Sequence, residues 1–260
     1  MKVVITCGGE GIRLKHQLAY IPKGLVYIDD KPLLWHIMKR FSLFGFNEFV
    51  LALGKNGNMI RDYFLRYNLY TNNIEFTIRR PMDIRYYNQS QEEDWKISFV
   101  NTGESANTGA RLARCQKYID TDDFLFTYSD CLSNVDLEKL SRRHTQAKKV
   151  ATVTGVMPPF RYGEFIMRSG KAVQYAAESK LMASQGCVNG GFVVFNKKIF
   201  SQLSSYNECV LENGVYKSLV KKKQIEVFQH KGFWQCLDND REHEYLKKLC
   251  ESNKRVWLEK

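Results

Sequence analysis

The chain has 260 residues, of which 44% are hydrophobic and 13% aromatic. This length and composition exclude a disordered chain and favour one folded domain, or one domain with a small appendage. The formal charge of +11 predicts an anionic partner. Basic residues are scattered and no nucleic-acid motif occurs, so we favour a nucleotide or sugar phosphate over nucleic acid or an acidic membrane surface.

The first half alternates short apolar strands with amphipathic helices. Strands are predicted at 3–7, 49–53, 74–78, 97–100 and 124–128. Helices are predicted at 32–45, 59–67 and 109–118. Apolar residues recur at helical spacing in the first of these, and Ile60, Phe64 and Leu65 are expected to face inward in the second. The polar segment 80–94 is expected to be a long excursion, and the alternation predicts a mostly parallel sheet covered on both faces.

The second half has a different rhythm, with few helices between its strands. Strands are predicted at 150–156, 165–167, 172–176 and 188–195. Helices are predicted at 197–203, 211–221 and 240–250. We therefore expect extra strands on one continuous sheet rather than an independent domain. The predicted class is α/β, with a mixed, mostly parallel sheet flanked by helices and extra strands in the C-terminal half.

A glycine-rich basic loop, Gly8-Gly9-Glu10-Gly11-Ile12-Arg13-Leu14, follows the first strand. Its glycines allow backbone N–H groups to approach an anion, and Arg13 adds a planar cation suited to phosphate. Lys23, after the turn-prone Ile21-Pro22, supplies a second cation. The spacing fits neither a Walker A loop nor a G-x-G-x-x-G fingerprint. The residues alone leave a polyphosphate cradle and a simple tight turn as alternatives.

Ser129-Asp130-Cys131 follows the buried strand at 124–128. In a parallel sheet, this segment and the loop at 8–14 lie at the same carboxyl edge. A carboxylate facing a phosphate-binding loop is suited to magnesium, whereas the alternative for Asp130 is a turn or helix cap.

The seven cysteines are odd in number, widely spaced and without a CxxC pair. We expect reduced thiols, not a disulfide framework or a zinc site. The N-terminus is predicted to be a strand rather than a signal peptide, and no apolar run approaches the roughly 18 residues of a membrane span. We therefore expect a cytoplasmic protein without a membrane anchor.

Collinear motifs extend from Lys2 to about Trp257. They are GGEGIRL at 8–14, IPKG at 21–24, DKPLLWHIMK at 30–39, NTGES at 101–105, TGARL at 108–112, FLFTYSD at 124–130, NGGF at 189–192 and GFWQCLD at 232–238. In these motifs the chain resembles the sugar-phosphate nucleotidyltransferases, most closely the glucose-1-phosphate cytidylyltransferases. The WHIM segment at 35–38 favours the cytidylyl branch.

The resemblance implies a Rossmann-like sheet of the nucleotide-diphospho-sugar transferase type. It implies one domain over 1–260, with a nucleotide-binding half at 1–148 and a sugar-binding half at 149–260. The implied reaction joins CTP and a sugar 1-phosphate into a CDP-sugar and releases pyrophosphate, with Mg²⁺ as cofactor. The expected assembly is a homo-oligomer, with no nucleic-acid or membrane partner.

Matching positions carry the implied roles on the nucleotide side. Gly8, Gly9 and Gly11 line the nucleotide, and Gly109 and Arg111 lie in the segment that closes over it. Arg13 binds the β- and γ-phosphates, and Lys23 neutralises charge at the α-phosphate, so these two are the implied catalytic residues. Asp130 and Asp238 hold the magnesium ion between them and must converge in the fold.

On the sugar side, Lys180 matches a lysine that grips the phosphate of the incoming sugar. Gly163, Asn189 and Gly190 shape the sugar pocket.

The chain departs from the family pattern at several positions. These are Ile12 for threonine, Gly24 for proline, Ser129 and Cys131 for glycines, Ser179 for a sugar-contacting glutamate and Glu164 for a small residue. Because the charged phosphate-binding residues are retained, we expect an active enzyme whose acceptor is glucose 1-phosphate or a related phosphorylated compound. The alternative is a non-catalytic nucleotide-binding or regulatory homologue. It is favoured by Ile12 and the lost glycines and opposed by the retained cations and carboxylates.

Overall fold

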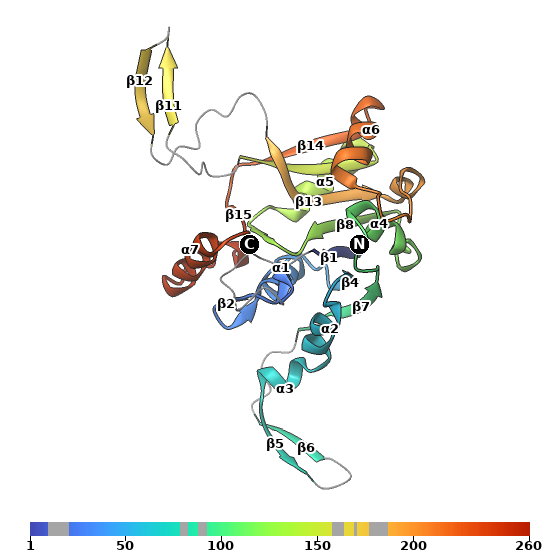
Figure 1. The fold of residues 1–260 in the computed structure, drawn as a ribbon, viewed down its shortest axis with the longest axis vertical. Helices are drawn as coiled ribbons and strands as arrows, with labels where there is room; N and C mark the ends of the chain where they lie inside the picture. Colours follow the sequence, from blue (N-terminus) through green and yellow to red (C-terminus); the bar gives the residue numbers. More distant parts are fainter. Residues whose placement is uncertain (10–20, 79–82, 88–92, 158–163, 169–170, 177–186) are drawn as a thin grey trace.

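The computed structural model describes residues 1–9, 21–78, 83–87, 93–157, 164–168, 171–176 and 187–260. A seven-stranded sheet forms the centre of the molecule, in the order β14-β10-β13-β8-β1-β4-β7 (Figure 1). Its strands are Ile225–His230 (β14), Ala151–Val156 (β10), Val188–Asn196 (β13), Asp123–Tyr128 (β8), Val3–Cys7 (β1), Glu48–Leu53 (β4) and Lys96–Asn101 (β7). Only β13 runs antiparallel to its neighbours, β10 and β8, so the predicted mixed, mostly parallel α/β sheet is confirmed.

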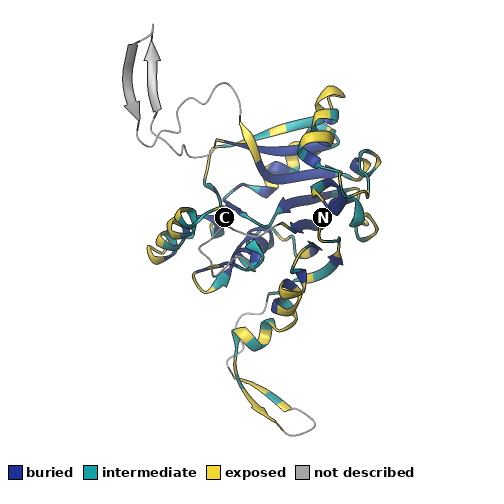
Figure 2. Cartoon of the chain, viewed as in Figure 1, coloured by how far each residue is buried: buried dark blue, intermediate teal, exposed yellow. Residues whose placement is uncertain are grey.

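The two faces of the sheet carry separate hydrophobic clusters. Along β1, Val3 and Ile5 belong to one cluster and Val4 to the other, as the alternation of side chains in a strand requires. All five residues of β1 are buried, which explains why this strand is mostly apolar, with Thr6 as its one polar residue, rather than alternating. Figure 2 shows the central strands buried between helices whose outer faces are exposed.

Helices cover both faces. Leu33–Ser42 (α1), Leu137–Ala147 (α5) and Asp240–Glu251 (α7) contribute to the cluster that contains Val3. Thr108–Arg114 (α4), Tyr216–Lys221 (α6) and the 3-10 helix Lys197–Gln202 contribute to the cluster that contains Val4. The predicted apolar face of α1 is confirmed, because Leu33, Leu34, Ile37, Met38 and Phe41 are all buried.

The predictions for the second helix and its neighbourhood are partly wrong. The helix is Gly57–Leu65 (α2), followed by the short Tyr67–Thr71 (α3); Ile60 is buried as expected, but Leu65 is 70% exposed. The strand predicted at 74–78 is Asn73–Thr77 (β5), which leaves the central sheet and pairs with Asp83–Tyr87 (β6). Four of its five residues are exposed, so β5 lacks the buried side chains that a central strand needs.

The C-terminal half also differs from the single continuous sheet expected there. Among the strands that the structure describes, Glu164–Arg168 (β11) and Lys171–Ala176 (β12) pair with each other alone, and Figure 1 shows this hairpin away from the central sheet. The predicted helix at 211–221 is a π-helix, Leu211–Val215, that continues into α6. Helix α5 and strand β14 were not predicted.

Two short ribbons complete the fold. Tyr27–Ile28 (β2) pairs with Lys31–Pro32 (β3), and Cys131–Ser133 (β9) pairs antiparallel with Trp234–Cys236 (β15). The second ribbon joins the end of β8 to the segment before α7 and therefore brings distant parts of the chain together. In the described ranges, no helix has the length and apolarity needed to cross a bilayer.

Candidate active site

The structure describes most of the predicted site residues. They are Gly8, Gly9, Lys23, Gly109, Arg111, Asp130, Asn189, Gly190 and Asp238. Gly11, Arg13, Gly163 and Lys180 lie outside the described residues, as do Ile12 and Ser179.

Lys23, Asp130 and Asp238 come together at the carboxyl edge of the sheet. Lys23 opens a 3-10 turn, Lys23–Leu25, in which the N–H of Leu25 donates to the carbonyl of Pro22 at 2.8 Å. The Lys23 Nζ lies 2.6 Å from Asp238 Oδ1 and 3.6 Å from Asp130 Oδ2. The predicted convergence of the two aspartates is therefore present, with a cation beside both.

The β9–β15 ribbon explains this convergence. Cys131 pairs with Cys236, and at the next position the N–H of Leu237 donates to the carbonyl of Asp130 at 2.8 Å. Asp130 therefore precedes one strand of the ribbon, and Asp238 follows the other. Asp238 is not the cap of α7, because the Asn239 side chain takes that role by accepting the N–H of Glu242 at 3.1 Å.

The charges of this cluster stabilise one another. Burial disfavours the charged Lys23, but the hydrogen bond to Asp238 and the charge of Asp130 outweigh burial and raise the Lys23 pKa above its ordinary value. Burial also raises the pKa of Asp130; Lys23 opposes that rise and the Asp238 carboxylate adds to it. The site therefore has a surplus of acceptor oxygens that favours bound positive charge.

These residues fit a magnesium ion. Two carboxylates face one cation, the Lys23 ammonium, and carboxylate oxygens are the ligands that Mg²⁺ takes alongside phosphate and water. Asp130 and Asp238 would hold the ion, while Lys23 is near enough to contact a phosphate bound to it.

The cysteine prediction is wrong at one pair. Cys131 and Cys236 form a disulfide with a Cα–Cα distance of 4.0 Å, whereas Cys7, Cys115, Cys187, Cys209 and Cys250 are free. The two are 105 positions apart, and only the pairing of β9 with β15 brings them opposite each other. The disulfide lies directly beside Asp130.

Arg111 is buried beneath the start of the glycine loop. Its guanidinium donates to Thr102 Oγ1 and the Gly103 carbonyl, each at 2.8 Å, and to the Glu104 carbonyl at 3.0 Å. A Cβ on Gly8 would overlap this guanidinium. Gly8 thus makes room for a protein side chain, and the structure places Arg111 as a support for the end of β1.

Gly9 and Gly109 differ in what surrounds them. Among the described residues, no atom lies within 4 Å of the position that a Cβ on Gly9 would occupy, so the side-chain face of Gly9 is open. On Gly109 a Cβ would lie 2.6 Å from Cys209 Sγ and 2.9 Å from the Cys209 carbonyl. Gly109 therefore permits α4 to pack closely on the segment around Cys209.

Asn189 and Gly190 lie at the start of β13, close to Tyr128. The Asn189 amide donates to Tyr128 Oη at 3.5 Å, and the Gly190 carbonyl accepts from the Trp234 indole at 2.9 Å. A Cβ on Gly190 would lie 3.0 Å from the Thr154 carbonyl, which explains the glycine there.

Sequence reasoning missed Glu212, which links the start of α4 to the end of β8 at this edge of the sheet. Glu212 accepts hydrogen bonds from the Tyr128 hydroxyl and, at 2.8 Å, from Thr108 Oγ1. It thereby joins α4 to the end of β8 and, through Tyr128, to Asn189. No motif in the sequence marks Glu212; its position on a π-helix, which is frequent at functional sites, is a signal that only the structure supplies.

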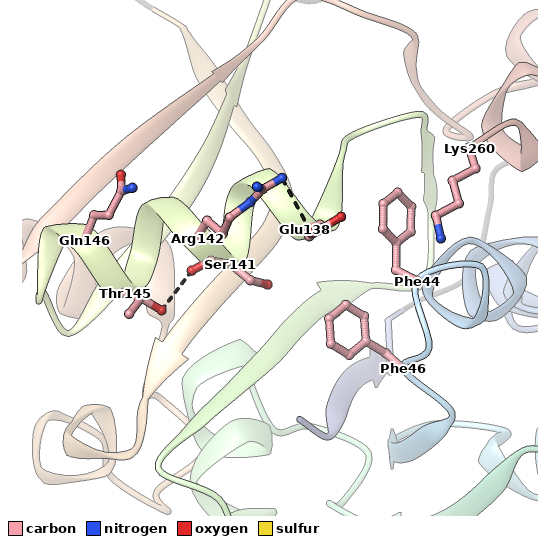
Figure 3. A pocket seen from close by; sticks show the side chains of 8 residues that line it. All are labelled: Phe44, Phe46, Glu138, Ser141, Arg142, Thr145, Gln146 and Lys260. Carbon is pink, nitrogen blue, oxygen red and sulfur yellow. Dashed lines mark hydrogen bonds and ion pairs between the residues drawn. The ribbon is translucent and has the colours of Figure 1, made fainter.

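A pocket of about 410 Å³ lies elsewhere, between α5 and the turn after α1. Figure 3 shows Phe44 and Phe46 facing the side chains of α5, where Arg142 and Glu138 form an ion pair at 3.5 Å. None of the predicted site residues that the structure describes lines this pocket.

Comparisons with known proteins show the family to which the chain belongs. The family model described as "Nucleotidyl transferase" matches residues 2–236. The chain is 35% identical to a probable glucose-1-phosphate cytidylyltransferase of Bacillus subtilis, over 99% of both chains. It is 34% identical to a glucose-1-phosphate cytidylyltransferase of Salmonella typhimurium, over 99% of this chain and 98% of the other. The structure of HddC from Yersinia pseudotuberculosis shares the fold, with a TM-score of 0.67 at 22% identity over 97% of this chain and 99% of that one. This chain belongs to the nucleotidyl transferase family.

Proposed function

We propose that the chain is a sugar-1-phosphate cytidylyltransferase that joins CTP and glucose 1-phosphate, or a related phosphorylated acceptor, into a CDP-sugar. The observation that carries this proposal is the placement of Lys23 between Asp130 and Asp238 at the carboxyl edge of the sheet. The names of the two relatives, at about one-third identity over nearly the whole chain, support CTP and glucose 1-phosphate as the substrates.

The proposed reaction is an in-line phosphoryl substitution. A phosphate oxygen of the sugar 1-phosphate attacks the α-phosphorus of CTP, and the bond from that phosphorus to the bridging oxygen breaks as pyrophosphate leaves. Such a reaction needs mainly alignment and neutralisation of charge. Magnesium, when bound, offsets the charge of the phosphates, and Asp130 and Asp238 are its proposed ligands.

Lys23 is the proposed catalytic cation at the α-phosphate. Its ammonium is held by two carboxylates, so its position is fixed before substrate binds. We assign Arg13 to the β- and γ-phosphates of the leaving group, and Lys180 to the phosphate of the acceptor, on the strength of their motifs.

The remaining residues have supporting roles in this proposal. The backbone around Gly9, with its open side-chain face, and Gly11 would approach the nucleotide. Gly109 and Arg111 would lie in the segment that closes over it, with the Arg111 guanidinium packed behind Gly8. Asn189, Gly190 and Gly163 would shape the sugar pocket. The halves 1–148 and 149–260 would bind nucleotide and sugar respectively, as one domain, and the assembly would be a homo-oligomer.

Pyrophosphate release from CTP, glucose 1-phosphate and Mg²⁺ tests the proposal. We expect Asp130→Asn to lower kcat about 10²-fold or more, because one of two metal carboxylates is lost. Asp122→Asn is a matched control, since Asp122 is an exposed aspartate that pairs with Lys197 at the other end of β8. A folded wild-type protein that releases no pyrophosphate with any sugar 1-phosphate would favour the non-catalytic alternative.

A further inference from the structure

The disulfide Cys131–Cys236 and the proposed magnesium ligands occupy the same few residues. Cys131 directly follows Asp130, and Cys236 lies two positions before Asp238. The two cysteines are the pair of the β9–β15 ribbon that adjoins both aspartates. Any change at these sulfur atoms therefore takes place at the edge of the metal site.

Three potential ligand atoms converge here. The sulfur atoms of Cys131 and Cys236 and a carboxylate oxygen of Asp130 all lie within 4.8 Å of one another. Two sulfurs and one oxygen suit a thiophilic cation such as Zn²⁺ or Cd²⁺, whereas Mg²⁺ prefers oxygen ligands only. A sulfur that is part of a disulfide cannot serve as a thiolate ligand.

We propose that Cys131 and Cys236 form a redox-gated site which, when reduced, binds a thiophilic divalent cation together with Asp130, and which the disulfide closes. The gating reaction is thiol–disulfide exchange with a small dithiol. The dithiol becomes a cyclic disulfide, and its two electrons and two protons convert the protein disulfide into two thiols. Binding of the metal then displaces the two thiol protons.

Accessibility sets the direction of attack. Cys131 is 5% exposed, whereas Cys236 is partly exposed. We therefore expect an external thiolate to attack the Cys236 sulfur, with Cys131 as the leaving thiol. Backbone hydrogen bonds also join the two segments on either side of this pair: the N–H of Leu237 donates to the Asp130 carbonyl at 2.8 Å, and the N–H of Asn134 donates to the Phe233 carbonyl at 3.1 Å. We therefore expect the two cysteines to stay opposite each other after reduction.

Asp130 is shared between the two metals. A carboxylate that binds Zn²⁺ through this set is no longer free to bind Mg²⁺ with Asp238. The consequence for activity rests on the proposed function: the reduced protein would be inhibited by Zn²⁺, and the disulfide form would resist it. The binding of the thiophilic metal itself does not depend on that function.

Cadmium titration tests the site without any enzyme assay. The protein carries the substitutions Cys187→Ser and Cys209→Ser, which remove the free cysteines that are not buried. We expect the phosphine-reduced protein to bind one Cd²⁺ per chain with a sulfur-to-cadmium charge-transfer band, and the oxidised protein to lack that band. Adding Cys236→Ser should weaken binding more than about tenfold, and adding Asp130→Asn should weaken it while leaving the band.

Cys250→Ser is the matched control, because Cys250 is a buried cysteine on α7 outside the ribbon, and it should leave the titration unchanged. Intact mass should also rise by two hydrogen atoms on reduction of the wild type and not of Cys236→Ser. The proposal is overturned if no such mass change occurs, or if Cys236→Ser binds Cd²⁺ as tightly as its parent. Because these results involve neither CTP nor sugar phosphate, they are independent of whether the proposed function holds.

Discussion

Lys23 and Asp238 are 215 positions apart in the chain, yet their side chains form a hydrogen bond of 2.6 Å. Asp130 completes the cluster from the end of β8. A turn near the N-terminus, the central sheet and the segment before the last long helix thus meet at one point. This meeting places a fixed cation and two carboxylates where the carboxyl ends of parallel strands form a binding edge.

Replacing Lys23 by Met should slow turnover strongly without unfolding the protein. Lys23→Met removes the cation proposed for the α-phosphate, and we expect kcat to fall about 10²- to 10³-fold. Steady-state pyrophosphate release measures this. Lys96→Met is the matched control, because Lys96 pairs with Glu48 on the surface at 3.3 Å and its loss should leave kcat unchanged. Equal kcat values for the two variants would remove Lys23 from the mechanism.

Gly8 should tolerate a side chain only when Arg111 is absent. The Arg111 guanidinium is held by three hydrogen bonds, so it cannot move aside for the Cβ of Gly8→Ala. We expect Gly8→Ala to destabilise the protein by about 2 kcal/mol and to cost much less in an Arg111→Ala background. Urea denaturation of the two single variants and the double variant gives the coupling.

Gly9→Ala is the control for this cycle, since nothing among the described residues contacts its new methyl group. Its stability should match the wild type, whereas the KM for CTP should rise if the backbone at Gly9 approaches the nucleotide. If the changes in unfolding free energy caused by Gly8→Ala and Arg111→Ala were additive, Arg111 would not be the reason for a glycine at position 8.

The stability of the fold should decline as the pH falls below neutrality. Burial lowers the pKa of His36 and of His144 below the ordinary 6.5; for His36 a hydrogen bond to the Ile28 carbonyl opposes the shift, and for His144 the nearby Asp123 does. As the pH falls, these two histidines therefore take up protons in the unfolded chain before they do so in the folded protein. This stabilisation is complete above the unfolded pKa of about 6.5 and is lost as the pH falls towards the lower folded values.

The His36 ring provides a structural reason for this sign. The Trp257 indole donates to His36 Nδ1 at 3.3 Å, and Nε2 contacts the Ile28 carbonyl at 2.9 Å, which matches a neutral ring protonated at Nε2. A second proton on Nδ1 would break the bond to Trp257. The same sign can be tested at His144, whose pKa is also lowered by burial. The urea midpoints at pH 8 and pH 5.5 should differ less for His144→Asn than for the wild type. Equal differences in the two proteins would contradict the lowered pKa of His144.

Tyr128→Phe should weaken the binding of both substrates, although it removes a single hydroxyl. That hydroxyl bonds to Glu212, which also holds Thr108 on α4, and it accepts from Asn189 on β13. We expect KM to rise for CTP and for the acceptor, with kcat less affected. Tyr118→Phe, outside this network, is the control. An unchanged KM for both substrates would limit Glu212 to a packing role.

Local patterns in the sequence were sufficient for the elements with uniformly buried or regularly spaced apolar residues, such as β1 and α1. They failed at β5, where Phe76 is an apolar residue that the fold leaves 54% exposed on a hairpin. An apolar run does not indicate which sheet a strand joins, because that depends on pairing with other strands elsewhere in the chain.

The candidate site shows the same limit. Strand order alone places Asp130 at the carboxyl edge, but the approach of Asp238 depends on the pairing of β9 with β15, which have three residues each. The resemblance to a family supplied that approach, and no local pattern did. The disulfide was missed for the same reason. The close packing of the Arg111 guanidinium against Gly8 and Gly54 is likewise visible only in three dimensions.

The most direct test of the central claim is identification of the product formed from CTP, glucose 1-phosphate and Mg²⁺, with Asp238→Asn in parallel. Mass spectrometry and pyrophosphate release should report equal amounts of a CDP-sugar and pyrophosphate for the wild type. Asp238→Asn should lower the rate about 10²-fold or more, because Lys23 and the metal lose their shared carboxylate. A folded wild type that forms no CDP-sugar, or an Asp238→Asn variant as fast as the wild type, would contradict the account.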